Sequence, residues 1–184
     1  MDVRESQRPR ILDAGLRVAG SDQGATITLE RVASEAGLTK PGLMYHFPNR
    51  EALMVALVEH AAHQLRRRMI DLLGTSPETA TVADRYRAYI QAAAQGENMR
   101  AEWALWFQSA YWPELQAAWT GPLEPWLSLP EGMPPGQRSR LMTARLAADG
   151  LWAAQASGVL RPSAADRSVI LAQLMELTRG GEAE

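Results

Sequence analysis

The sequence contains no cysteine, and this absence excludes two kinds of chemistry. Without a thiol the chain can form no disulfide framework and can present no thiolate as a nucleophile or a metal ligand. No apolar run approaches the ~18 residues that a membrane-spanning helix needs. The opening segment MDVRESQRPR also lacks the apolar stretch of a secretory signal. We therefore expect a cytoplasmic protein.

Lysine is almost absent as well: Lys40 is the one lysine, and every other basic residue is arginine. The net charge is −2 and the isoelectric point is about 6.0, so the chain as a whole is not a polycation. This balance does not exclude nucleic acid, because affinity for DNA depends on basic groups placed locally at the phosphates.

Strand-like alternation of polar and apolar residues and internal repeats are also missing. What remains is a succession of apolar residues at steps of three and four, which is typical of amphipathic helices. The sequence therefore predicts an all-α fold of about nine helices.

Signals of catalysis are scarce too. The chain has three histidines, His46, His60 and His63, all in its first third, and no glycine-rich phosphate loop. His60 and His63 share one helix face and would suit a metal ion, but no other cluster of carboxylates and histidines completes such a site. We expect neither an enzyme nor a cofactor or metal site.

The most informative stretch is TLERVASEAGLTKPGLMYHF, from Thr28 to Phe47. Thr28 is a good N-cap, and Gly37 suits the left-handed residue that ends a helix. Between them, four apolar residues fall on one helical face: Leu29, Val32, Ala33 and Ala36. These features predict a first short helix that is buried on that face.

A second short helix follows the turn. Leu38 is expected to be buried in the turn, Thr39 is a second N-cap, and Pro41 suits a first helical turn. Leu43 and Phe47 would form the core face, which leaves these residues pointing outward: Lys40, Gly42, Tyr45 and His46. The pattern is that of a helix-turn-helix whose second helix enters the major groove, although an ordinary helical hairpin would look similar.

The flanks extend this pattern. A helix is expected from Arg8 to Gly24, and after Pro48 another is expected to be capped by Asn49 and to run about two dozen residues along a stripe from Leu53 to Leu72. Thr26 and Thr28 lie at a helix N-terminus, whose free amides favour a phosphate, and Arg50 lies beside the same face.

The remainder predicts helices separated by turn formers. The expected helical ranges are Val82 to Gln95, a segment around Trp103 to Ala110, Pro113 to about Trp119, Gln137 to Ser157 and Ser163 to Thr178. Thr120 to Gly136 is rich in proline and glycine, and we expect it to be irregular.

Five of the six tryptophans lie between Glu97 and Trp126. Because indole faces attract cations, this aromatic segment is the best candidate for a ligand pocket, with nearby carboxylates such as Asp149 balancing a positive charge. The alternative is that the tryptophans fill a core between helices. The candidate ligand-binding residues are Trp103, Trp106, Phe107, Tyr111, Trp126, Asp149 and Trp152.

The N-terminal third resembles the tetracycline-repressor (TetR) family of bacterial regulators. The residues that carry the resemblance are Ile11-Leu12-x-Ala14, Gly24-Ala25-Thr26-x-Thr28-Leu29, Val32-Ala33-x-x-Ala36-Gly37-Leu38-Thr39-Lys40, Leu43, His46-Phe47 and Asn49-Arg50-Glu51-x-Leu53. The resemblance implies a helix-turn-helix DNA-binding domain over residues 1–50 and a helical ligand-binding and dimerisation domain over residues 51–184.

Position by position, the resemblance implies DNA contacts. The residues that match DNA-contacting positions of the family are Thr28, Lys40, Pro41, Gly42, Tyr45, His46 and Arg50. One departure is Met44, where the family commonly has a tyrosine that bonds to phosphate. Gly42 also removes a side chain from a base-reading position, so the sequence preference is left open.

The resemblance further implies a homodimer formed through the last two long helices, a palindromic operator on double-stranded DNA, and a small-molecule effector that releases the repressor. A cationic or aromatic amphipathic compound is the effector that the tryptophans favour. The competing interpretation is an architectural DNA-binding protein without an inducer, which would show little sequence preference.

Overall fold

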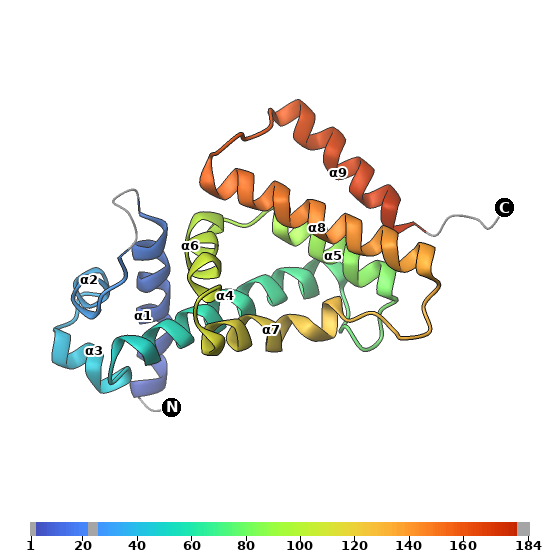
Figure 1. The fold of residues 1–184 in the computed structure, drawn as a ribbon. Helices are drawn as coiled ribbons and strands as arrows, with labels where there is room; N and C mark the ends of the chain where they lie inside the picture. Colours follow the sequence, from blue (N-terminus) through green and yellow to red (C-terminus); the bar gives the residue numbers. More distant parts are fainter. Residues whose placement is uncertain (1–2, 22–25, 180–184) are drawn as a thin grey trace. The chain divides into compact units, whose positions relative to one another are not determined.

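The computed structural model describes residues 3–21 and 26–179, and in these ranges the chain forms nine helices and no strand (Figure 1). The predicted all-α fold is confirmed. The helices are α1 (Val3–Gly20), α2 (Leu29–Glu35), α3 (Lys40–His46), α4 (Arg50–Leu73), α5 (Val82–Ala94), α6 (Met99–Ser109), α7 (Pro113–Leu127), α8 (Pro135–Ser157) and α9 (Ala164–Thr178).

The helices fall into two compact units. The first holds Met1–His63 and Asn98–Pro122, and the second holds Gln64–Glu97 and Leu123–Glu184. Helices α4 and α7 each contribute residues to both units. The sequence predicts a boundary at residue 50 between a DNA-binding and a ligand-binding domain. That boundary divides the chain by function and not by compactness, and it stays a prediction.

The first unit is built around α1, which packs against α2, α3 and α6 (Figure 1). Apolar residues at helical spacing on each element point into one core, and burying them supplies most of the stabilisation of such short helices. The large buried side chains include Ile11, Leu12, Leu16, Ile27, Val32, Leu43, Phe47, Leu53 and Leu57.

The predicted caps of the first unit are confirmed. The Thr28 and Thr39 hydroxyls accept from the amides of Arg31 and Gly42, each at 3.2 Å, and Asn49 Oδ1 accepts from an amide of α4 at 2.8 Å. Each such cap contributes about 1 kcal/mol. Gly37 has a φ of +69°, the left-handed conformation that ends α2.

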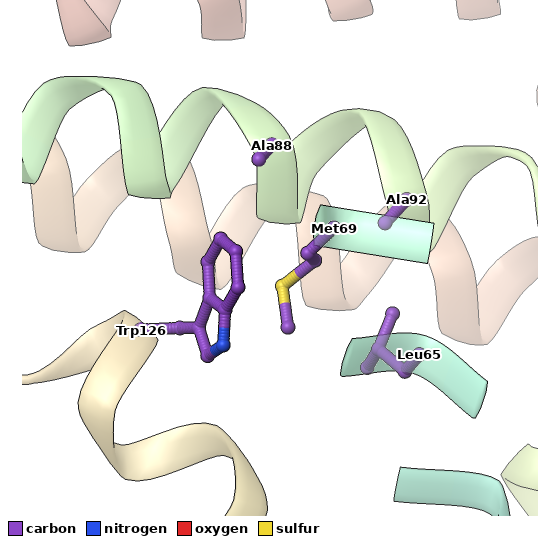
Figure 2. Packing of buried hydrophobic residues seen from close by; sticks show 5 residues of the cluster. All are labelled: Leu65, Met69, Ala88, Ala92 and Trp126. Atoms are coloured by element: carbon purple, nitrogen blue, oxygen red, sulfur yellow. The ribbon is translucent and has the colours of Figure 1, made fainter. Parts of the chain in front are cut away.

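The second unit has two apolar clusters. In the first, shown in Figure 2, Leu65 and Met69 of α4, Ala88 and Ala92 of α5 and Trp126 of α7 pack together, with the indole facing the Met69 side chain. The second cluster joins α5, α8 and α9 through Ile90, Ala144, Ala148 and Leu174.

Some of the expected helix boundaries and burials are wrong. Helix α1 begins at Val3 instead of Arg8, so Pro9 lies inside it; its described part ends at Gly20, while Gly24 and Ala25 lie outside the described residues. Leu38 is half-buried instead of buried in the turn. Leu72, expected on the apolar stripe of α4, is 42% exposed.

The largest error concerns α7, which continues into the expected irregular segment as far as Leu127. Gly121, Pro122 and Pro125 do not end the helix because its far end is held by the second unit. Trp126 is fully buried there. The terminal carbonyls are also satisfied: that of Leu127 accepts from the Tyr86 hydroxyl at 2.8 Å, and Arg85 donates to those of Pro125 and Ser128.

Replacing Gly15 should overpack the first unit. An added Cβ would lie 2.4 Å from Leu57 Cδ2, and Leu57 is itself fully buried. We expect Gly15→Ala to lower the free energy of unfolding by about 1–3 kcal/mol, measured by urea denaturation followed by circular dichroism.

Gly136→Ala is the matched control for this substitution. Its added Cβ in the first turn of α8 would meet only the end of the Arg140 side chain at 4.0 Å. Adding Leu57→Ala to Gly15→Ala should relieve the clash, so the two losses should sum to more than the loss in the double variant. Strictly additive losses would contradict the steric explanation.

Candidate nucleic-acid interface and effector surface

The outer face of α3 is the exposed part of the helix-turn-helix. The side chain of Lys40 is 50% exposed at its start, and Met44 and Tyr45 are 40% and 64% exposed further along. Leu43 and Phe47 are buried beneath them, as predicted. The helix therefore presents polar and aromatic groups on a base fixed by the core.

His46 was expected to point outward, and this expectation is wrong: the residue is only 6% exposed. It follows Leu43 by three residues and so shares its buried face, a spacing that the sequence already contained. His46 Nε2 lies 3.3 Å from Gln7 Oε1 of α1, and the Arg8 guanidinium lies 4.7 Å from the centroid of the neighbouring Phe47 ring. The start of α1 thus covers the end of α3.

The first turn of α3 is shaped by Pro41 and Gly42. Pro41 is exposed and lacks only an amide hydrogen that a first turn leaves unbonded. A Cβ at Gly42 would lie 3.2 Å from Thr39 Oγ1, the capping oxygen. Glycine therefore leaves room for the cap at this position.

The residues before α2 are held by two arginines. The Arg50 Nε donates to the carbonyl of Ile27 at 2.8 Å, and Arg31 donates to the carbonyl of Thr26 and to the Ser21 hydroxyl, each at 3.3 Å. Thr26 itself is exposed. These bonds fix the approach to α2, where Thr28 stands as N-cap. The sequence alone did not indicate the role of Arg31.

One ion pair crosses the predicted DNA-contacting surface. Lys40 Nζ lies 2.7 Å from Glu30 Oε1, and both side chains are at least half exposed. The hydrogen bond from Lys40 is the main cause that holds the pKa of Glu30 below its ordinary value, so this carboxylate is ionised at neutral pH. The lone lysine is therefore neutralised locally.

Four of the candidate ligand-binding residues form a continuous row on α6 and just beyond it, which we call the aromatic ladder: Trp103, Trp106, Phe107 and Tyr111. The Trp103 and Trp106 rings stack at 5.5 Å, and Phe107 lies 6.2 Å from Trp103 and edge-on to Tyr111 at 6.0 Å. Trp106, Phe107 and Tyr111 are 49%, 53% and 72% exposed. The opposite side of α6 is buried, and the helix packs against α1.

The other three candidates lie in the second unit. Trp126 is part of the core shown in Figure 2. For this residue the structure therefore agrees with the alternative that a tryptophan fills a core between helices. Trp152 is half-buried on α8. Asp149 accepts hydrogen bonds from the Tyr89 hydroxyl and from Arg145, the latter at 3.0 Å; burial nevertheless raises the pKa of its carboxyl.

One of the two histidines on α4, His60, has a structural explanation. His60 Nε2 lies 2.8 Å from Asp13 Oδ1 of α1, which links the two helices. Within the described ranges, no group of three or more metal-ligating side chains comes together. In the same ranges, no helix combines the length and the apolar character that crossing a membrane requires.

Two family models match the chain. Residues 83–179 match the model described as tetracyclin repressor-like, C-terminal domain, and residues 11–57 match that of bacterial regulatory proteins, tetR family. Together the matched ranges contain α2, α3 and α6 to α9, all but the first residue of α5, the second half of α1 and the start of α4.

Several solved structures share the fold. A protein from Rhodococcus sp. described as a TetR-family transcriptional regulator covers 95% of this chain and 100% of its own, with 17% identity and a TM-score of 0.70. The multidrug binding protein EbrR complexed with ethidium covers 93% and 98%, with 22% identity and a TM-score of 0.60. The TetR-like regulator LfrR from Mycobacterium smegmatis, in complex with proflavine, covers 100% of both chains at 22% identity and a TM-score of 0.57.

A curated relative matches a shorter stretch. The nucleoid occlusion factor SlmA of Marinobacter nauticus is 38% identical over 58 residues, which is 32% of this chain and 30% of the relative. The match therefore spans less than a third of the length of that protein and carries no conclusion about its activity.

The partly buried Asp149 should make the stability of the fold depend on pH. Because burial raises its pKa above 3.8, the folded state holds this proton more tightly than the unfolded state does, so stability falls as pH rises from 3.8 through the folded pKa. Asp149→Asn removes this contribution and keeps an acceptor for Tyr89. We expect the free energy of unfolding of Asp149→Asn, minus that of the wild type, to rise with pH across that window. Urea titrations at a series of pH values measure this difference.

Asp71→Asn is the control for this comparison, because Asp71 is an exposed carboxylate on α4. Its difference from the wild type should vary less with pH. A difference between Asp149→Asn and the wild type that stays constant with pH would contradict the assignment.

Proposed function

The chain belongs to the TetR family of bacterial regulatory proteins, and from that premise we propose that it is an effector-responsive repressor that binds a palindromic operator as a homodimer. The family and the fold are those of non-enzymatic DNA-binding transcriptional regulators. A protein with this role works where the chromosome is, in the bacterial cytoplasm.

The observation that carries the proposal is the exposed face of α3, with Lys40 and Tyr45 standing on a buried base. The major groove is about 12 Å wide and admits one helix, which reads bases with its N-terminal residues. In this pose Thr26, Thr28 and Arg50 approach phosphates beside the groove. His46 is proposed to act by positioning α3 against α1.

A two-fold dimer would present two such helices. Exposed apolar side chains on both α8 and α9 support a partner surface there, because a second copy that covers them would remove apolar area from water. They are Met142, Leu146 and Val169, which are 41%, 54% and 58% exposed. Two copies related by symmetry imply an operator of two inverted half-sites.

The aromatic ladder is the proposed effector surface. Its exposed π faces suit a flat cation, which gains cation–π attraction and stacking at once. The ethidium and proflavine in the structures of EbrR and LfrR guide this choice of ligand class. Since α6 packs on α1, and α1 packs on α3, an effector that prefers one arrangement of these helices would change DNA affinity.

An architectural DNA-binding protein without an inducer is the competing function. It would bind a random duplex as well as any selected one and would ignore cationic dyes. A repressor should instead prefer a duplex that the wild type selects from a random library, and two subunits should occupy each selected site in sedimentation experiments.

Replacing Lys40 should weaken DNA binding without harming the fold. We expect Lys40→Ala to lower affinity for selected and random duplexes and to reduce the slope of log K against log salt by about 0.9 per lost phosphate contact. Fluorescence anisotropy of labelled duplexes over a salt series measures both quantities.

Arg179→Ala is the matched control for the loss of one positive charge. Arg179 is exposed and pairs with Glu176 at the end of α9. Its loss should leave the salt slope almost unchanged. Equal slopes for both variants would remove α3 from the proposed interface.

Replacing Trp106 should weaken binding of a cationic dye. Trp106→Ala removes one stacked ring, and we expect the affinity for ethidium or proflavine to fall about two- to thirtyfold in isothermal titration. Trp112→Ala is the control, since Trp112 is similarly exposed at 52% but lies outside the ladder. Unchanged dye binding by Trp106→Ala, or no binding by the wild type, would exclude the ladder as the effector surface.

A further inference from the structure

Glu30 places a negative charge on the surface proposed for phosphate contact. It is the second residue of α2, two positions after the Thr28 cap, and its carboxylate lies 2.7 Å from Lys40 Nζ. The Thr28 hydroxyl is another neighbour that favours its ionised form. Glu30 therefore interacts with two of the residues proposed to approach DNA, Thr28 and Lys40.

We propose that Glu30 competes with DNA phosphates for Lys40, so that binding to any duplex must first exchange this ion pair. The inference rests on the proposed function and adds a residue that limits affinity. No other lysine of the chain can replace Lys40 in this exchange, because the sequence contains no second one.

Two physical effects act in the same direction. The first is the loss of an attraction: Lys40 gives up the carboxylate when it turns to a phosphate, so part of the new interaction replaces an old one. The second is repulsion, because the released Glu30 then faces a phosphate backbone of the same sign. Neither effect depends on the identity of a base, so the weakening is uniform across sequences.

A neighbouring ion pair provides the comparison that the test needs. Glu35 ends α2, and its Oε1 lies 2.6 Å from the Arg17 Nε of α1. This pair is also exposed, involves the same helix and contains the same kind of carboxylate. It does not involve α3.

The experiment measures binding of the full chain to a fluorescein-labelled random duplex of about 30 base pairs, over a series of salt concentrations. We expect Glu30→Gln to bind about two- to thirtyfold more tightly as a dimer and to steepen the salt dependence, because Lys40 then releases counterions without a competitor. Glu35→Gln changes net charge equally and should gain less than half of this effect on a logarithmic scale.

The competition itself is tested in a Lys40→Ala background. There Glu30→Gln can relieve only the repulsion, so its gain should be clearly smaller than in the wild type. An equal gain in both backgrounds would overturn the competition, and so would an equal gain from Glu35→Gln. An unchanged or weaker affinity of Glu30→Gln would overturn it as well.

The single lysine allows a second readout that needs no DNA. Reductive methylation with ¹³C-formaldehyde labels one side-chain amine in the whole chain, that of Lys40, and keeps its positive charge. We expect the resonance of this amine to shift in Glu30→Gln and to stay in place in Glu35→Gln. An identical resonance in wild type and Glu30→Gln would show that the pair does not form in solution.

The two proposals fail in different ways. In one case the wild type binds no duplex at low salt while the Lys40 resonance still responds to Glu30→Gln. The ion pair is then supported, whereas DNA recognition by this surface and the competition proposed for it are both contradicted. If the wild type binds DNA but Glu30→Gln changes nothing, only the competition fails.

Discussion

The arrangement of the proposed DNA-reading surface depends on the burial of Leu43 and Phe47 beneath α3. A helix of seven residues is far below the ~12–15 residues at which an isolated helix becomes even marginally stable in water. Its direction is therefore set by packing against α1 and α2, by the Thr39 cap and by the contacts that α1 makes at its end. This core therefore determines where the exposed side chains of α3 lie.

Local signals explain why the helix-turn-helix was predictable. Thr28, Thr39, Asn49 and Gly37 act through hydrogen bonds or dihedral preferences that span three or four residues, and such information is complete within the sequence. The predicted caps and the left-handed glycine accordingly agree with the structure.

The errors arise where distant residues decide. Helix α7 continues past its prolines because Arg85 and Tyr86, some forty residues earlier, satisfy its last carbonyls and because Trp126 enters a core. Tryptophans of the same aromatic segment also differ in burial: Trp126 is fully buried, whereas Trp106 is half exposed. The sequence places both in one aromatic segment, and only the packing partners separate core from surface.

The close approach at Gly42 has a consequence for how such a regulator can evolve. A side chain at this position would press on the capping oxygen of Thr39, whereas Met44 and Tyr45 extend outward without taking part in any cap. Gene duplicates can therefore diverge in operator preference through Met44 and Tyr45 while the helix keeps its start. Gly42 is thus a constraint on folding within a surface whose positions 44 and 45 are open to adaptation.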